Sequence, residues 1–136
     1  MSHFGPALSA ESSNDPLFRM RAYTIANNLV ETAYLDAKTL SRDPVAERMS
    51  GQLYAAVGSI VANLGEGYSR SSGKDRAHIF EYALGSVREA MGWYRAARPI
   101  LGEIVRERLN ALEEIRRLLL AIIARERGRT IGPNKK

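Results

Sequence analysis

Arginine is the residue type in this sequence with the clearest capacity to bind a partner, and it is concentrated in the second half of the chain. Residues 87–136 contain 12 Lys or Arg against 6 Glu, whereas residues 1–86 contain 8 against 9 acidic residues. Because a guanidinium group binds phosphate through two parallel hydrogen bonds, this excess predicts a surface for RNA or DNA. The candidate nucleic-acid-binding residues are Arg88, Arg95, Arg98, Arg106, Arg108, Arg116, Arg117 and Arg125.

A solvated helix face is the alternative interpretation of these arginines. A nucleic-acid surface requires the arginines on one side, and a symmetric oligomer would multiply a modest excess into a ring of positive potential. Since no aromatic-rich base-stacking motif accompanies them, we expect contacts with the phosphate backbone rather than with particular bases. The acidic residues of the same region that are placed to pair with several arginines are Glu103, Glu107, Glu113, Glu114 and Glu126.

Other kinds of chemistry lack the residues that they require. His3 and His78 are the only histidines, and neither has a second ligand at metal-binding spacing. Glu66, Glu81 and Glu89 do not form the Glu-x-x-His pairs of di-iron bundles, and no serine has a histidine base or a nucleophile-elbow context. The chain has no cysteine, which permits a reducing cytoplasm. We therefore expect no enzyme activity, no metal and no cofactor.

The elements that position the arginines are organised around a helical hairpin at residues 59–89. Apolar residues recur at three- and four-residue spacing on both sides of its turn, which is typical of amphipathic helices. Gly67 is predicted to end the first helix in a left-handed conformation. Ser72 is predicted to cap the second helix, because Asp75 follows three residues later. The sequence therefore predicts two antiparallel helices joined by a tight turn.

Further side chains of the hairpin have predicted structural roles. Glu66 can pair with Arg70 one turn later, and Glu89 is expected to accept hydrogen bonds across the hairpin. Tyr68 is expected to bury its ring against the third helix. Small residues run beside the apolar stripe of the helix before the turn, so that another backbone can approach it closely. This small-residue stripe comprises Gly51, Ala55, Gly58, Ser59, Ala62 and Gly65.

The hairpin resembles a known family over residues 59–89 without a gap. The residues that carry the likeness are Ser59, Ile60, Ala62, Asn63, Glu66, Gly67, Tyr68, Arg70, Ser72, Lys74, Ala83, Leu84, Gly85, Ser86 and Glu89. They are similar to the signature of the S23-related four-helix-bundle proteins, which are encoded in intervening sequences of bacterial 23S ribosomal RNA. That family is similar in structure to the accessory variability proteins of diversity-generating retroelements, which are pentameric bundles that bind nucleic acid and a reverse transcriptase. The resemblance implies a homopentamer, with RNA or DNA and a reverse transcriptase as partners.

The whole chain is predicted to fold as an all-α, antiparallel up-down-up-down four-helix bundle. A length of 136 residues suits one domain. Apolar residues occupy more of the first helix than one bundle covers, which favours association with other copies. The predicted segments are a flexible arm at 1–14, a bundle at 15–128 with helices at 16–40, 44–68, 73–98 and 103–127, and a basic tail at 129–136.

The sequence also bears on where the protein works. The first residues lack the basic start and long apolar run of a secretory signal, and no stretch approaches the ~20 apolar residues of a membrane span. We therefore expect a cytoplasmic protein without a membrane partner.

Two functions stay open at this point. One is an oligomeric bundle that binds nucleic acid, as an accessory to a reverse transcriptase or to ribosomal RNA, and the other is a structural or protein-interaction module with no nucleic-acid role.

Overall fold

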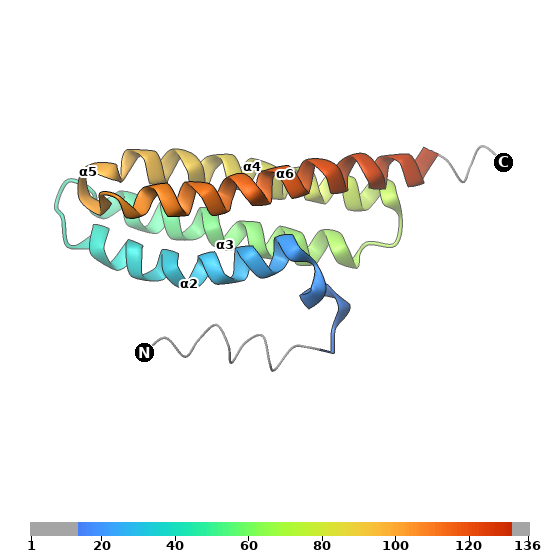
Figure 1. Ribbon diagram of the computed structural model, residues 1–136, viewed down its shortest axis with the longest axis horizontal. Helices are drawn as coiled ribbons and strands as arrows, with labels where there is room; N and C mark the ends of the chain where they lie inside the picture. The colour runs from blue at the N-terminus through green and yellow to red at the C-terminus, as the bar shows by residue number, and fades with distance from the viewer. Residues whose placement is uncertain (1–13, 132–136) are drawn as a thin grey trace.

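The computed structural model describes residues 14–131, which form four long helices and two short helical segments. Figure 1 shows the long helices side by side, each running opposite to the next in sequence. Within residues 14–131 there is no strand, and the predicted all-α up-down-up-down bundle is confirmed. The elements are η1 (Pro16–Arg19), α2 (Arg21–Ser41), α3 (Glu47–Ser69), α4 (Gly73–Ala96), α5 (Arg98–Leu101) and α6 (Ile104–Ile131).

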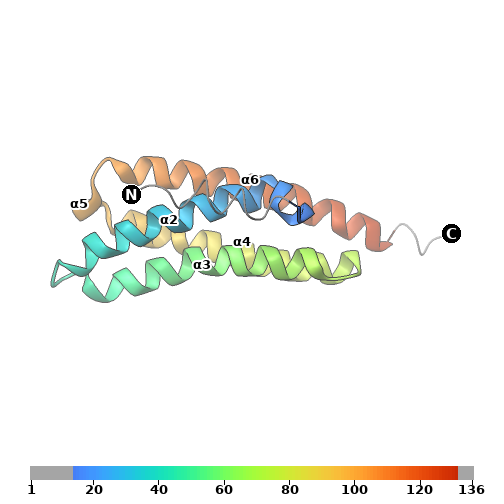
Figure 2. The same cartoon turned by 90° about the horizontal axis from the view of Figure 1, so that it is seen from below.

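Each long helix packs against two others. α3 lies between α2 and α4, and α6 contacts both α4 and α2, which closes the bundle. The hairpin of α3 and α4 forms the most extensive of these pairings and extends along most of the bundle, as Figure 2 shows. The contact between α2 and α6 is the least extensive of the four. The predicted hairpin is therefore the central unit of the fold.

The core combines large apolar residues with alanines from α2, α3 and α4. Leu64, Phe80 and Tyr94 are completely buried, and they come from α3 and α4. Half of the buried residues of α2 are alanines, which leave room for its backbone to approach α3 closely. The buried residues of α2 are Ala22, Ala26, Leu29, Ala33, Asp36 and Leu40.

The first two helices begin later than the sequence predicts. Asp15 does cap a helix, because its side chain accepts a hydrogen bond from the backbone N–H of Leu17, but that helix is the short 3-10 segment η1. Met20 has extended backbone angles, φ −72° and ψ 119°, and separates η1 from α2. Asp43 accepts hydrogen bonds from the backbone of the next turn, and α3 starts only at Glu47. An Asp-Pro pair thus fixes a local turn without fixing the start of the long helix.

The sequence predicted that Gly67 ends its helix in a left-handed conformation, and this prediction is wrong. α3 continues through Gly67 to Ser69, and Gly102 is the only residue with positive φ in the described part of the chain. Gly67 is buried against α4, where an added Cβ would lie 2.7 Å from both Cδ1 and Cε1 of Phe80. Glycine is required at this position for close approach of a ring rather than for a left-handed turn. The predicted cap at Ser72 is confirmed, since its hydroxyl accepts from the Asp75 N–H at 3.1 Å.

The connection between α4 and α6 agrees with the sequence prediction, but α6 ends later than predicted. Pro99 lies in the first turn of α5, and Gly102 follows it with φ 68°, so these two residues interrupt the chain between α4 and α6 as predicted. α6 continues past Gly128 to Ile131, which extends it into the predicted basic tail. The predicted flexible arm, apart from residue 14, and tail residues 132–136 lie outside the described residues.

Candidate nucleic-acid interface

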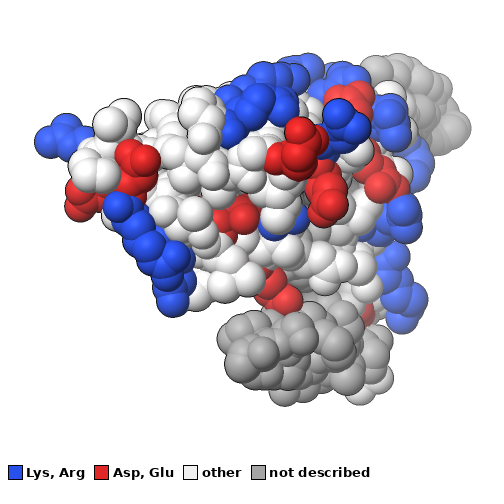
Figure 3. Space-filling model, turned by 60° about the vertical axis from the view of Figure 1, so that its left-hand side comes forward, with Lys and Arg blue, Asp and Glu red and all other residues white. Residues whose placement is uncertain are grey.

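Most of the predicted arginines are exposed on α4, α5 and α6. Figure 3 shows a run of Lys and Arg side chains along the upper part of the molecule, which is the side where Figure 1 draws α4 and α6, with acidic side chains among them. Apart from Arg117, these residues have no ion pair with any residue in the described part of the chain. We call this set the arginine face, and it consists of Arg88, Arg95, Arg98, Arg106, Arg117 and Arg125.

Two arginines of α6 bind Glu113 of the same helix. Arg116 binds the Glu113 carboxylate through two hydrogen bonds, Nε to Oε1 at 3.0 Å and Nη2 to Oε2 at 2.7 Å. Arg117 reaches the same carboxylate at 3.8 Å. The pKa of Glu113 is lowered, chiefly by the hydrogen bond from Arg116 and further by the charges of Arg117 and Arg95. Since Arg95 belongs to α4, its charge acts on Glu113 across the pairing of α4 with α6.

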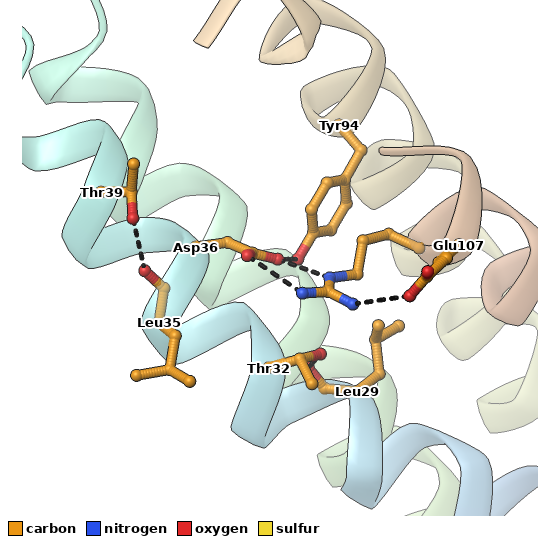
Figure 4. A network of polar contacts seen from close by, with 8 residues as sticks. Leu29, Thr32, Leu35, Asp36, Thr39, Tyr94 and Glu107 are labelled. Carbon is orange, nitrogen blue, oxygen red and sulfur yellow. Dashed lines mark hydrogen bonds and ion pairs between the residues drawn. The ribbon is translucent and has the colours of Figure 1, made fainter. Parts of the chain in front are cut away.

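Arg108 does not belong to this surface, which corrects the sequence prediction. Its side chain is only 12% exposed, and it binds the buried Asp36 of α2 through Nε at 2.7 Å and Nη2 at 3.2 Å. The Tyr94 hydroxyl of α4 donates to the same Asp36 carboxylate at 2.7 Å (Figure 4). Three helices thus meet at one charged network inside the bundle, and the remaining nitrogen of its arginine, Nη1, lies 3.8 Å from Glu107 of the same helix.

The network has a defined electrostatic character. Burial first, and the hydrogen bond to Asp36 second, raise the pKa of the Tyr94 hydroxyl above its ordinary value. Burial alone would lower the pKa of Arg108, but the hydrogen bond and the charge of Asp36 outweigh burial and raise it. The network therefore keeps Tyr94 neutral and Arg108 positively charged at neutral pH.

A second internal ion pair joins the turn end of the hairpin to α6. The Nε atom of Arg76 lies 3.3 Å from Oε1 of Glu126, and their side chains are 17% and 1% exposed. Arg76 also donates from Nη1 to the carbonyl oxygen of Tyr68 at 2.6 Å and lies over the Tyr68 ring. Glu126, which the sequence placed among the surface partners of the arginines, is an internal residue. Tyr68 is only half-buried, with Arg76 across its ring.

The polar residues of the hairpin join its two helices near the middle. The Ser86 hydroxyl of α4 donates to the Ser59 hydroxyl of α3 at 3.0 Å. Asn63 donates from its side-chain nitrogen to the carbonyl and hydroxyl oxygens of Ser59, at 3.0 and 3.2 Å. Ser59 is thus the acceptor that connects α3 to α4. Gly85, which neighbours Ser86, is exposed, and an added Cβ there would meet nothing within 4 Å.

The predicted partners of the two hairpin glutamates have different outcomes. The ion pair of Glu66 with Arg70 is confirmed. Glu89 instead accepts a hydrogen bond from the Trp93 ring nitrogen, at 3.3 Å, within its own helix. The predicted hydrogen bonds from Glu89 across the hairpin are therefore wrong for the described contacts. An exposed carboxylate on α4 pairs more readily with the next turn than with the neighbouring helix.

The internal charged residues escaped sequence reasoning, although a signal was present. Asp36 falls on the same stripe as Leu29, Ala33 and Leu40, at spacings of three and four residues. A carboxylate in an otherwise apolar stripe signals a buried polar group that requires partners. Its partners could not be found in this way, because Tyr94 and Arg108 lie on other helices.

Residues 14–131 contain neither a metal-binding cluster nor a candidate membrane span. In that range, no group of three or more His, Asp or Glu residues is arranged to hold a metal ion. None of the helices described is both long enough and apolar enough to cross a bilayer.

Comparison with known proteins identifies the family of the chain. Residues 19–123 match the 23S rRNA-intervening sequence protein family. The chain belongs to that family. A crystal structure of a protein of unknown function from the S23 ribosomal protein family of Bacteroides thetaiotaomicron VPI-5482 has the same fold, with a TM-score of 0.70 and 24% sequence identity. The alignment covers 75% of this chain and 97% of that chain. Among curated proteins, none matches the sequence significantly.

Proposed function

We propose that this member of the family is a non-catalytic, oligomeric bundle that binds the phosphate backbone of RNA or DNA through the arginine face. The observation that carries the proposal is the exposure of the arginine face on α4 and α6, two helices that pack against each other. Apart from Arg117, the arginines of this face have no ion pair with any described residue. Exposed guanidinium groups on neighbouring helices suit the repeated phosphates of a nucleic acid.

The family supplies the first nucleic acid to test. It is named for the intervening sequence of 23S ribosomal RNA, so RNA of that kind is the natural probe. A role as an accessory factor to a reverse transcriptase is part of the same proposal, since the family resembles the accessory variability proteins. The sequence has no aromatic-rich base-stacking motif beside these arginines, and binding should depend on backbone charge more than on sequence.

Self-association belongs to the proposal because part of one helix face is left open by the described chain. Gly51 and Ala55 of the small-residue stripe of α3 are exposed, and an added Cβ at Gly51 or Gly58 would meet nothing within 4 Å. A glycine in a solvated helix destabilises it by about 1 kcal/mol relative to alanine, so packing by another copy would offset this cost. We expect a homo-oligomer, a pentamer by resemblance to the family. A monodisperse mass near 15 kDa in light scattering would contradict this expectation.

A charge-reversal experiment tests the nucleic-acid proposal. Two variants with the same formal charge are compared by fluorescence anisotropy with labelled RNA and DNA over a range of salt. The test variant changes four residues of the arginine face to Glu: Arg95, Arg98, Arg106 and Arg117. The control variant changes four exposed basic residues elsewhere: Arg19, Arg42, Arg48 and Lys74.

The test variant should lose binding while the control retains most of it, and circular dichroism should show the same helical content for both. Affinity of the unmodified protein should fall with salt, with a log–log slope of roughly −0.7 to −0.9 for each phosphate neutralised. Equal binding by the two variants, or affinity that does not change with salt, would favour a structural or protein-interaction module.

A further inference from the structure

A cavity of about 320 Å³ lies between α2 and α3, where α4–α6 and the arginine face take no part. It is lined by Val30, Glu31 and Tyr34 of α2 and by Tyr54 of α3. This volume is at the lower end of the range for small-molecule sites, which is about 300–1,000 Å³. Its lining joins one carboxylate to two aromatic rings, and no structural role described above uses any of these side chains.

Glu31 carries an unsatisfied atom. Its Oε2 is buried and accepts no hydrogen bond within the described residues, and no described cation lies within ion-pair distance of its carboxylate. A buried carboxylate oxygen without a partner is unfavourable, and a cation that donates hydrogen bonds would remove this penalty. The side chain therefore favours a positively charged occupant of the cavity.

The two tyrosines provide surfaces that attract cations. Their rings meet edge to face, with centroids 5.9 Å apart and an interplanar angle of 64°. Tyr34 is 49% exposed and Tyr54 is 40% exposed, so parts of both rings remain open. The ammonium group of Lys38 lies 5.7 Å from the Tyr34 centroid, and this ring already attracts one cation. Aromatic faces beside a carboxylate are the groups that recognise alkylammonium and guanidinium ions.

We propose that this cavity binds an organic cation, a guanidinium or alkylammonium group, which pairs with Glu31 and contacts Tyr34 and Tyr54. The group belongs either to a free small molecule or to an Arg or Lys side chain of a second copy of the chain. The chemistry is the same in both cases. It is opposite in sign to the phosphate chemistry of the arginine face, so each proposal can fail without the other.

The test uses two probes and two variants of the full chain. N-acetyl-arginine methyl ester is compared with N-acetyl-citrulline methyl ester, which has nearly the same shape without the charge, by following the ring signals of Tyr34 and Tyr54 in NMR. Glu31→Gln removes the charge at constant size, and Glu47→Gln is the control at an exposed carboxylate of α3. Oligomeric mass is measured by analytical ultracentrifugation with and without the charged probe.

For a free ligand, the charged probe should bind more tightly than the neutral one. Glu31→Gln should weaken its binding by about tenfold or more, as expected for loss of a charged hydrogen bond, with no change in mass. For a side chain of a second copy, Glu31→Gln and the charged probe should each lower the oligomeric mass. The proposal is wrong when Glu31→Gln matches Glu47→Gln in both probe affinity and mass. Should Glu31→Gln fail to fold, Tyr54→Leu, which removes an aromatic face, replaces it in both measurements.

Discussion

Replacing Gly67 by Ala is expected to destabilise the protein, although alanine is the better helix former. The new Cβ would lie 2.7 Å from two ring atoms of Phe80 and 3.3 Å from a third, and Phe80 is completely buried. Overpacking of this kind costs about 1–3 kcal/mol, whereas the gain in helix propensity is about 1 kcal/mol. The net loss should be about 1 kcal/mol and can reach about 2, which lowers the midpoint of thermal unfolding by roughly 3–5 °C per kcal/mol for a chain of this size.

Gly92→Ala is the matched control for this substitution. Gly92 lies in α4, is exposed, and would place its Cβ more than 4 Å from any neighbouring atom. The same change in the unfolded chain applies to both sites, so the difference between them isolates the contact with Phe80. Both variants are unfolded by heat and by urea at one protein concentration, because association would shift the midpoints. Gly92→Ala should be neutral or stabilised by up to about 1 kcal/mol.

A double-mutant cycle with Phe80→Leu completes the test. Leucine lacks the Cε1 and Cζ atoms that the new Cβ would meet, so Gly67→Ala should cost less in the Phe80→Leu background than in the unmodified protein. The reasoning is refuted if Gly67→Ala and Gly92→Ala change stability equally, or if Phe80→Leu leaves the cost of Gly67→Ala unchanged.

Further predictions concern the internal network and the arginine face. Asp36→Ala should lose about 3–5 kcal/mol in urea unfolding, because it leaves Arg108 buried without its partner, whereas Tyr94→Phe should lose about 1 kcal/mol; equal losses would contradict this order. The raised pKa of Tyr94 means that the folded protein keeps a proton that the unfolded chain loses, so stability should fall as pH rises above about 10. Tyr94→Phe should reduce that fall, and an unchanged pH profile would argue against it. Glu113→Gln should strengthen RNA binding by freeing Arg116 for phosphate, and weaker binding in anisotropy would contradict this role.

The sequence by itself determined the helices and the local contacts. The three- and four-residue spacing of apolar side chains predicted four long helices and the hairpin, because this period is a property of one helix and of the face that it must bury. The cap at Ser72 and the pair of Glu66 with Arg70 were also predicted, since both join residues within one turn. The same period predicted that the candidate arginines lie outside the apolar stripes, and most of them are exposed.

Only the tertiary structure decided which side chains meet between helices. The ring of Phe80 leaves room only for glycine at position 67. Arg108 pairs with Asp36, and Arg76 pairs with Glu126. In each case the two residues lie on different helices. The spacing of one helix gives the direction of its buried face but contains no information on the residue that stands opposite. The rotation and the axial position of the neighbouring helix determine that residue, and both depend on the packing of the whole core.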